Sequence, residues 1–570
     1  MPQGRKKTPF SGKAKKQQMQ AKKQRQNRAI LVSRDADDEC ENPENSGLKN
    51  IQKINKQPQD GNSGKGKYSL QFFQESKHEI EKRKEDARKC IEPIPLEGQE
   101  VSDDYFPPEI DLPKRPPWDF NMSKEQLDLR EQKYFSEYLR KMEELRDISY
   151  FELNLETWRQ LWRVLEMSDV LLVIVDIRFP VLMFPPYLYN YVTNELGKEM
   201  ILVLNKIDLA PAPLVLAWRE YFKSQYPKLR ILFFTSFPSY NLRGNTASGG
   251  NMKTRRRKGK MKMAAEGAQK LMETCREIVA DKVDLTSWQE KIQEEMHLEY
   301  DLDDLERKDN VIIQKEDTSF FKHETFKNGI LTIGCIGTPN VGKSSLMNAL
   351  MGKKVVSVSR TPGHTKHFQT IFLTKNVCLC DCPGLVFPST VPKQLQILMG
   401  SFPIAQVREP YTAVKFIAER IDLPKLLRIQ HQDNDDTWSS MDICDGWAAK
   451  KNYLTAKAAR LDTYRAANSL LRMSLEGKIC FYVYPRGWAR KKDEWAKHPD
   501  VETIKWIQAK TESDQDFQKE SNYSSSENEE DGGRSSTVSD RDSGEGEDED
   551  EDDPNMPITV NKFGALATDA

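Results

Sequence analysis

Continuous runs of apolar residues recur through the central part of the chain, and stretches with a helical pattern lie between several of them. The runs do not alternate with polar residues, which is typical of strands buried on both faces of a parallel sheet. We therefore predict an α/β fold in which helices cover both faces of a parallel sheet. The predicted strands are Val170–Val175, Met200–Leu204, Leu229–Phe234, Ile330–Ile336, Gln369–Leu373 and Val377–Cys380.

Two amphipathic helices are expected before the first of these strands. The first begins after Ser123, which together with Gln126 has the spacing of a capping box. Both helices carry an apolar stripe at helical spacing, and we expect each stripe to pack against the sheet. The stripes consist of Leu127, Tyr134, Phe135, Tyr138, Met142 and Leu145 in the first helix and of Trp158, Leu161, Trp162 and Leu165 in the second.

The distribution of charge divides a chain that, at 570 residues, is too long for a single core. Residues 1–28 hold ten Lys or Arg and no Asp or Glu, whereas Glu545–Asp553 is almost entirely acidic. Such segments are typical of disordered tails. The predicted divisions are a basic disordered arm at 1–66, a helical region at 67–150, the sheet domain at 151–400 with a charged insertion at 241–328, a basic helical region at 401–510 and an acidic disordered tail at 511–570.

Several classes of protein are excluded by composition. The basic N-terminal segment lacks the apolar stretch of a secretory leader. The longest apolar runs, such as Val170–Val175, are far shorter than the roughly 20 residues that span a membrane. Nine cysteines, an odd number without framework spacing, fit reduced thiols. We expect an intracellular, soluble protein without membrane partners, and a monomer.

Residues 337–344 read GTPNVGKS and match the phosphate-binding pattern GxxxxGK[ST]. A predicted strand precedes the motif and a helical pattern follows it. In such a loop, backbone N–H groups surround the phosphates at a helix N-terminus, Lys343 reaches the β and γ oxygens, and Ser344 ligates Mg²⁺. The residues predicted to bind nucleotide here are Gly337, Asn340, Val341, Gly342, Lys343, Ser344 and Ser345.

The tetrapeptide 205–208 follows another predicted strand and matches NKxD. The Asp208 carboxylate can accept hydrogen bonds from N1–H and from the exocyclic amine of guanine, a pair that adenine does not present. Asn205 is expected to brace the loop and the stem of Lys206 to cover the face of the base. Alone the motif is weak, because Asn and Asp are ordinary residues in a turn that ends a strand.

The segment 381–384 matches DxxG and also ends a predicted strand. Asp381 is expected to hold Mg²⁺ through water, and the N–H of Gly384 to sense the γ-phosphate. Thr365 is suited to be a second hydroxyl ligand of Mg²⁺. An exposed Pro-Gly turn is the alternative interpretation. The predicted catalytic residues are thus Lys343, Thr365 and Gly384, and the predicted metal ligands are Ser344, Thr365 and Asp381.

The order of these motifs along the chain is unusual. In ordinary guanine-nucleotide hydrolases the phosphate loop comes first and NKxD follows DxxG, whereas here NKxD precedes the phosphate loop. One sheet can still hold every motif, because joining close termini and opening a surface loop preserves the core. Each motif follows the C-terminal end of a predicted strand, where nucleotides bind in open parallel sheets. The sequence therefore predicts a P-loop sheet with a circularly permuted order.

This order, together with the DIRFP segment 176–180, resembles the circularly permuted GTPases of the YlqF/YawG (MMR-HSR) type, most closely the vertebrate guanine nucleotide-binding protein-like branch. The resemblance covers about residues 150–485. It implies a GTP-binding and GTP-hydrolysing switch that uses Mg²⁺ and acts in ribosome assembly or nuclear export, with a ribosomal subunit or ribosomal RNA as partner. The alternative is a scaffold that binds RNA or the ribosome, is stabilised by GTP and has little or no turnover.

Three positions refine this interpretation. Leu385 stands directly after DxxG, where many GTPases place the glutamine that orients the attacking water, so intrinsic hydrolysis should be slow and depend on a partner. Ser236 is expected to offer its backbone N–H to guanine O6, although the segment reads Thr-Ser-Phe instead of Ser-Ala-Lys. Asn340 resembles the asparagine that binds an activating K⁺ in some GTPases; a helix-entry residue is the alternative.

Basic segments outside the predicted strands indicate polyanionic partners. Lys253–Lys262 holds seven basic residues, and like the N-terminal arm it fits either a nuclear-import signal read by an import receptor or a contact with RNA. We expect residence in the nucleus or nucleolus, with either role compatible with shuttling to the cytoplasm. A further basic face is predicted in the C-terminal helical region from Lys450, Lys451, Lys457, Arg460, Arg465 and Arg472.

Overall fold

The computed structural model describes one unit of the chain, which lies within Met1–Thr511. The described residues are 51–53, 71–73, 77–102, 105–145, 148–235, 267–297, 313–314, 324–352, 355–356, 369–432, 435–455 and 459–508. Most of the predicted basic arm and the whole acidic tail lie outside them. The arm was expected to lack regular structure, but β1 (Ile51–Lys53) pairs with β2 (Gln71–Phe73) in a short antiparallel ladder.

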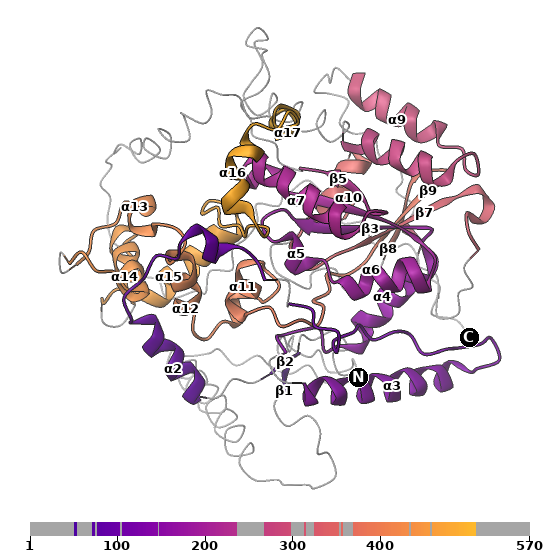
Figure 1. Ribbon diagram of the computed structural model, residues 1–570. Helices are drawn as coiled ribbons and strands as arrows, with labels where there is room; N and C mark the ends of the chain where they lie inside the picture. The colour runs from indigo at the N-terminus through magenta and orange to yellow at the C-terminus, as the bar shows by residue number, and fades with distance from the viewer. Residues whose placement is uncertain are drawn as a thin grey trace, which may run out of the picture. The chain divides into compact units, whose positions relative to one another are not determined.

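The described unit contains a seven-stranded sheet (Figure 1). The strands of this sheet follow the order β5-β4-β3-β7-β9-β8-β6. Its middle strands β3, β4, β7 and β9 are buried along most of their length, because their side chains are apolar on both faces. The sheet confirms the predicted α/β fold. The strands span Val170–Asp176 (β3), Glu199–Asn205 (β4), Arg230–Phe233 (β5), Ile313–Gln314 (β6), Leu331–Ile336 (β7), Gln369–Thr374 (β8) and Val377–Asp381 (β9).

The prediction of an all-parallel sheet is wrong at one edge. The pairs β3–β4, β3–β7, β4–β5 and β7–β9 are parallel, but β8 runs antiparallel to β9 and to β6. Only Lys375 and Asn376 separate β8 from β9, and two residues can close a hairpin but cannot make the crossover that a parallel pair needs. The two adjacent apolar runs were therefore a hairpin signal.

Both predicted amphipathic helices are present. α3 (Lys124–Glu144) begins at Ser123, whose hydroxyl accepts a hydrogen bond from the N–H of Gln126 while the Gln126 side chain returns to the Ser123 N–H, so the capping box is complete. α4 (Leu155–Met167) buries both of its tryptophans and packs against β7. Among the described residues, none of the helices combines the length and apolarity that crossing a bilayer would require.

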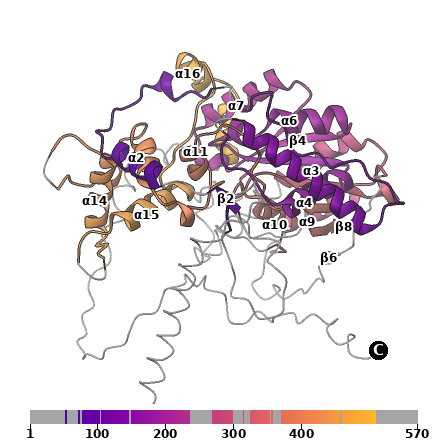
Figure 2. The ribbon, with the colours of Figure 1, turned by 90° about the horizontal axis from the view of Figure 1, so that it is seen from below.

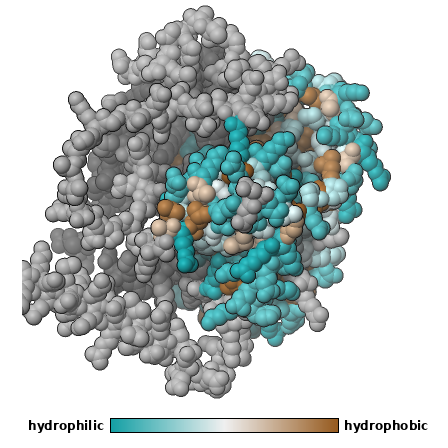
Figure 3. Space-filling view, turned by 90° about the vertical axis from the view of Figure 1, so that its left-hand side faces the viewer, coloured by the Kyte–Doolittle hydropathy of each residue, from teal (hydrophilic) through white to brown (hydrophobic). Residues whose placement is uncertain are grey.

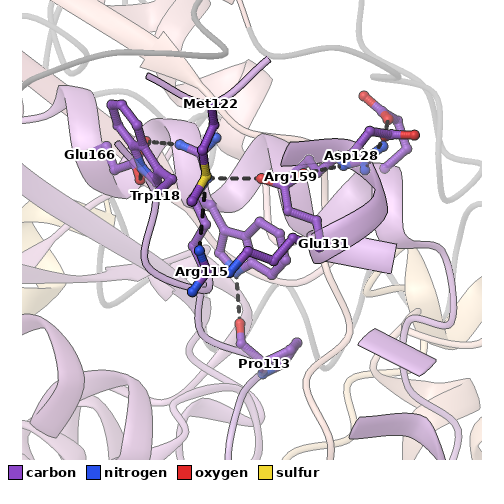
Figure 4. Close-up of polar contacts among 11 residues, drawn as sticks. Pro113, Arg115, Trp118, Met122, Asp128, Glu131, Arg159 and Glu166 are labelled. Atoms are coloured by element: carbon purple, nitrogen blue, oxygen red, sulfur yellow. Dashed lines mark hydrogen bonds and ion pairs between the residues drawn. The ribbon is translucent and has the colours of Figure 1, made fainter. Parts of the chain in front are cut away.

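A buried ion network fastens α3 to α4 (Figure 4). Glu131, on α3, accepts a hydrogen bond at 3.0 Å from Arg115 and one at 2.7 Å from Arg159 of α4. The side chains of Arg115 and Glu131 are only 7% and 5% exposed. Arg115 also pairs at 2.6 Å with Glu166, next to the end of α4. Because such pairs lose their partners if the helices separate, they fix the N-terminal helical region on the sheet domain.

The predicted charged insertion contributes to the core. Residues 267–279 form a helix, and α9 (Thr286–His297) follows it. Apolar side chains of this segment join the same buried cluster as the sheet, which gives the helices a fixed place against it. These side chains are Ala268, Leu271, Met272, Cys275, Val279, Val283, Leu285, Trp288 and Ile292. The basic cluster Lys253–Lys262 lies outside the described residues.

The C-terminal region is helical, as predicted, and returns to the sheet domain. Its last two helices pack against α7 (Ala212–Gln225), which follows β4. One of its middle helices, α12, packs against α2 (Lys77–Ala87) of the N-terminal region. Figure 2 shows α14 and α15 beside α2. The helices span Lys393–Leu398 (α11), Tyr411–Ala418 (α12), Leu423–Leu427 (α13), Ser440–Lys450 (α14), Thr463–Leu475 (α15), Trp488–Ala496 (α16) and Val501–Gln508 (α17).

Candidate nucleotide-binding site

The phosphate loop connects β7 to α10 (Lys343–Met351), as the motif predicts. Asn340 and Gly342 have φ angles of 61° and 97°, so the loop curls through the left-handed region before the helix starts. A Cβ on Gly337 would lie 2.5 Å from the carbonyl oxygen of Ile174, on the neighbouring strand. The glycines therefore permit a close approach that any other residue would block, and the helix N-terminus presents its N–H groups to an anion.

Lys343 lies inside this loop and is only 7% exposed. Its Nζ donates hydrogen bonds to the carbonyl oxygens of Gly337, at 3.0 Å, and Thr338, at 2.9 Å. Burial lowers the pKa of Lys343, because the charged form loses hydration. Both hydrogen bonds of this ammonium group go to neutral carbonyls, so the group gains from an anion and the arrangement favours the binding of a phosphate.

Asp381, at the end of β9, is fully buried, and neither of its carboxylate oxygens has a hydrogen-bond partner among the described residues. Burial raises the pKa of Asp381 to about 6, and the nearby Lys343 opposes that rise. A buried carboxylate without a partner is costly unless a cation compensates it. Carboxylate and hydroxyl oxygens are hard ligands, so Asp381 and Ser344 fit Mg²⁺ held with the nucleotide.

The NKxD loop is bonded directly to the phosphate loop. The Nδ2 of Asn205 donates to the carbonyl of Val341 at 2.7 Å, and Nζ of Lys206 donates to the carbonyl of Asn340 at 2.5 Å. Asp208 accepts a hydrogen bond at 2.6 Å from the hydroxyl of Thr235, which follows β5. The structure thus joins two motifs that lie more than 130 residues apart and orients the carboxylate expected to read guanine.

A buried charge cluster lies behind this junction. Asp176, at the end of β3, receives two hydrogen bonds from the Arg178 guanidinium, at 3.0 and 2.8 Å, and an ion pair from Lys206 at 2.9 Å. These cations hold the pKa of Asp176 well below its usual value although burial opposes them. Arg178 also donates to the carbonyl of Ser474 at 2.7 Å, in α15. Asp176 and Arg178 therefore connect the NKxD lysine to the C-terminal helices.

DxxG also lies against the phosphate loop. A Cβ on Gly384 would be 2.9 Å from the Cα of Pro339, so this position requires glycine. The next residue, Leu385, is fully buried and donates its N–H to the carbonyl of Gly337 at 3.2 Å. The Nδ2 of Asn340 donates to the carbonyl of Gly400 at 3.1 Å, which joins the loop to the residues after α11.

Not every predicted site residue is described. The structure brings together Gly337, Asn340, Val341, Lys343, Asn205, Lys206 and Gly384 through the contacts given above, and places Ser344 and Ser345 in the first turn of α10. Ser236 and Thr365 lie outside the described residues, so their roles stay predictions. Sequence reasoning gave no role to Thr338, which lies within the phosphate-loop motif, or to Gly400 and Gln508, which contact the site through the tertiary fold.

Comparison with known proteins bears on this geometry. Residues 332–432 match the family model MMR_HSR1, described as 50S ribosome-binding GTPase. The chain is 45% identical to mouse guanine nucleotide-binding protein-like 1 over 535 residues, which cover 87% of this chain and 88% of that protein. The chain belongs to the guanine nucleotide-binding protein-like 1 family. The human member is 44% identical over 544 residues, 88% of this chain and 89% of its own length.

More distant relatives of the guanine nucleotide-binding protein-like 1 family also match. Mouse large subunit GTPase 1 homolog is 30% identical over 430 residues, 66% of each chain. The solved structures of YlqF include a GDP-bound form, with 17% identity, a TM-score of 0.32 and coverage of 58% of this chain and 99% of that one. The GNP-bound YlqF of T. maritima gives 18% identity and the same TM-score.

Membership in the guanine nucleotide-binding protein-like 1 family agrees with the observed site. The protein is a GTP-binding P-loop GTPase, and GTPases of this kind typically use Mg²⁺ with the nucleotide. NKxD at the end of β4 and the phosphate loop after β7 occupy one sheet with only β3 between them, although NKxD comes first in the chain. The predicted circular permutation is thereby confirmed.

The segment that follows DxxG pairs with the N-terminal region at Glu152, which is 4% exposed. Glu152 donates its N–H to the carbonyl of Val386 at 3.0 Å, and its carboxyl accepts the N–H of Asn154 at 2.9 Å. Burial raises the pKa of Glu152 to about 7 from a usual value of 4.5, against the backbone hydrogen bonds that lower it. The folded protein therefore prefers the neutral carboxyl.

We expect Glu152→Gln to stabilise the protein at alkaline pH. Because the pKa of Glu152 is raised on folding, ionisation costs stability fully above pH 7, by about 3 kcal/mol, and the cost fades as the pH falls toward 4.5. The amide remains neutral and can still accept from Asn154. Urea unfolding should therefore show a gain of about 2–3 kcal/mol at pH 8 and a much smaller one at pH 5. Glu143→Gln, on the exposed side of α3, is the control and should stay within about 0.5 kcal/mol. An equal gain at both pH values would contradict the titration.

Proposed function

We propose that this GTPase is a nucleotide-dependent switch in ribosome assembly or nuclear export, with slow intrinsic hydrolysis that a partner accelerates. The observation that carries the proposal is the position of Leu385. Its side chain is fully buried in the core and its N–H is bonded to Gly337. A buried alkyl group directly after DxxG has no means of orienting the attacking water, so the reaction depends on a group from elsewhere.

The chemistry assigned to the remaining site residues follows from their contacts. Lys343 would move from two carbonyls to the β- and γ-phosphates and stabilise the charge there. Mg²⁺, held by Ser344 and Asp381, would neutralise further phosphate charge. Asp208 would select guanine, and Gly384, which already touches the phosphate loop, would report the γ-phosphate to the segment that leads into the helical region.

Ribosomal RNA is the partner that the surface of the helical region supports. The described part of the predicted basic face is exposed: Lys450, Lys451, Arg460, Arg465 and Arg472. Arg465 lies over the Tyr453 ring at 4.5 Å and Lys451 over Trp447 at 5.1 Å, so cations and aromatic rings are interleaved there. The face seen in Figure 3 is predominantly hydrophilic among the described residues. Such a surface is suited to phosphate contacts.

Residence in the nucleus or nucleolus belongs to the same proposal. The basic segments 1–28 and Lys253–Lys262, both outside the described residues, fit recognition by an import receptor. A second candidate function is a scaffold that holds GTP without turnover. Leu385 favours it as well, because a buried leucine after DxxG is also what a site without catalysis would show.

Single-turnover hydrolysis of GTP, with and without purified ribosomal subunits, tests the proposal. We expect slow turnover alone and acceleration on the order of 10²-fold or more by a subunit, since a partner must complete the site. Lys343→Ala measured in parallel subtracts contaminating activity. The series is run in K⁺ and in Na⁺, and faster turnover in K⁺ is expected if Asn340 helps to bind that ion. Tight GTP binding without turnover under all conditions would favour the scaffold.

A further inference from the structure

The last described helix, α17, reaches the NKxD loop. Its final residue, Gln508, is 1% exposed and belongs to the buried polar groups of the protein. The Nε2 of Gln508 donates hydrogen bonds to the carbonyl oxygens of Ile207, at 2.6 Å, and Ala210, at 2.9 Å. These two carbonyls lie on either side of Asp208. One side chain from the far end of the chain thus spans the turn that carries the guanine-reading carboxylate.

The chemistry of this contact suits an amide. Both partners are carbonyl oxygens, which only accept, and the Gln508 side chain supplies two N–H donors without introducing a charge. The turn needs such support, because Lys206 has a left-handed backbone with φ of 59° and residues Ile207–Leu209 form only a single 3₁₀ turn. Two hydrogen bonds across the turn limit its movement and therefore the direction of the Asp208 carboxylate.

α17 has anchors other than Gln508. Val501 and Ile504 of this helix are 5% and 1% exposed, and the helix packs against α7. Asp500, just before it, forms an ion pair with Arg219 of α7 at 2.8 Å. The two hydrogen bonds of Gln508 therefore bear mainly on the loop, because the helix is anchored by other contacts.

We propose that Gln508 is a positioning residue for guanine recognition, acting through the NKxD turn on Asp208. The inference rests on the proposed role of Asp208 in selecting guanine. A second contact from the C-terminal region supports it: a Cβ on Gly477 would lie 2.6 Å from a methyl group of Leu209. The turn is thus enclosed between the end of α15 and the end of α17, and displacement of α17 would loosen the hold on the base.

The test compares GDP with IDP, whose base lacks the exocyclic amine. Asp208 accepts two hydrogen bonds from guanine and one from hypoxanthine, so a misplaced carboxylate harms GDP more. In the full-length protein, Gln508→Leu and Gln508→Glu are expected to weaken GDP binding about 10-fold and IDP binding about 3-fold. The ratio of the two dissociation constants should fall about 3-fold. Trp506→Ala, at an exposed position of α17, is the matched control and should leave the ratio unchanged.

Dissociation constants are measured by calorimetry well below the thermal midpoint of each variant, because general destabilisation would weaken both nucleotides equally. If both Gln508 variants keep the wild-type ratio, the positioning role of Gln508 is overturned. If the wild-type protein itself does not distinguish GDP from IDP, the assignment of Asp208 fails and the inference with it. Glutamate at position 508 can introduce a buried charge, whereas leucine cannot. If both variants lower the ratio of the dissociation constants equally, the cause is the loss of the N–H donors and not a buried carboxylate.

Discussion

Replacing Lys343 with alanine is expected to weaken the binding of GDP and GTP by roughly 10²- to 10³-fold. The Nζ of Lys343 lies within the curl of the phosphate loop, bonded to the carbonyls of Gly337 and Thr338. Those carbonyls remain when the lysine is removed, and without a cation in between they repel the phosphate oxygens. The remaining backbone N–H groups and the magnesium ligands account for the affinity that survives.

The same substitution should not destabilise the protein without nucleotide. Burial already lowers the pKa of Lys343, which means that the folded protein resists its charge. Thermal unfolding without nucleotide should therefore give a midpoint equal to or above that of the wild type, whereas the rise in midpoint on adding GDP should disappear. Lys223→Ala, at a side chain of α7 that is 54% exposed, is the control for loss of a lysine. A lower midpoint together with unchanged GDP affinity would show that Lys343 is structural.

The elements of the sheet could be predicted because strong local signals coincide with the tertiary environment. The runs of β3, β4, β7 and β9 are apolar on both faces, and every one of them is covered in the structure. The phosphate loop could be predicted equally well, because its motif fixes both glycines. A Cβ on Gly337 would meet the neighbouring strand β3, and Gly342 has a left-handed backbone close to the Asn205 side chain. The direction of β8 was missed because periodicity describes burial and not orientation. The direction of β8 follows from the two-residue connection to β9, which allows only an antiparallel pair.

The parts of the site that could not be predicted depend on contacts between distant residues. Arg178 was noted only as part of a motif, and its bond to Ser474 spans 296 residues. Gln508 bonds to Ile207 across 301 residues, and nothing in its local sequence distinguishes it from any glutamine near the end of a helix. Such roles follow from how the C-terminal helices return to the sheet, which a single sequence does not encode in a local pattern.

Because of the permutation, the chain leads from DxxG directly into the helical region, and the distant contacts connect that region to the nucleotide site. In this chain, DxxG is followed by the segment bonded to Glu152 and then by α11, whose end reaches Asn340 through Gly400. α15 is tied to Arg178, and α17 is tied to the NKxD turn. The helical region therefore contacts the base loop, the phosphate loop and the charge cluster. The proposed control of the nucleotide state by a partner would use these contacts.

Arg178→Met is expected to cost about 3–5 kcal/mol of folding stability, the range for removing one partner of a buried ion pair. The guanidinium is 1% exposed and satisfies both oxygens of Asp176 as well as the Ser474 carbonyl. Methionine has a similar length but no side-chain donor, so Asp176 would keep only Lys206 and the backbone N–H of residue 178, and the Ser474 carbonyl would lose a bond. Arg230→Met is the control. That arginine pairs with Glu199 at 2.6 Å, with side chains 33% and 53% exposed, so its loss should cost about 1 kcal/mol or less.

Urea unfolding at two pH values measures this effect and identifies its origin. The pKa of Asp176 is held well below its usual 3.8, so its carboxylate contributes stability above that pH, and the contribution is lost as the pH falls toward the folded-state pKa. The difference between the wild type and Arg178→Met should therefore be largest near pH 7 and smaller at pH 3. Adding Asp176→Asn to Arg178→Met should recover part of the loss, since the buried carboxylate that lost the guanidinium is then removed. If the double variant is as unstable as the two single losses added together, Arg178 acts through Ser474 and packing, and the charge cluster is not what holds α15 to the base loop.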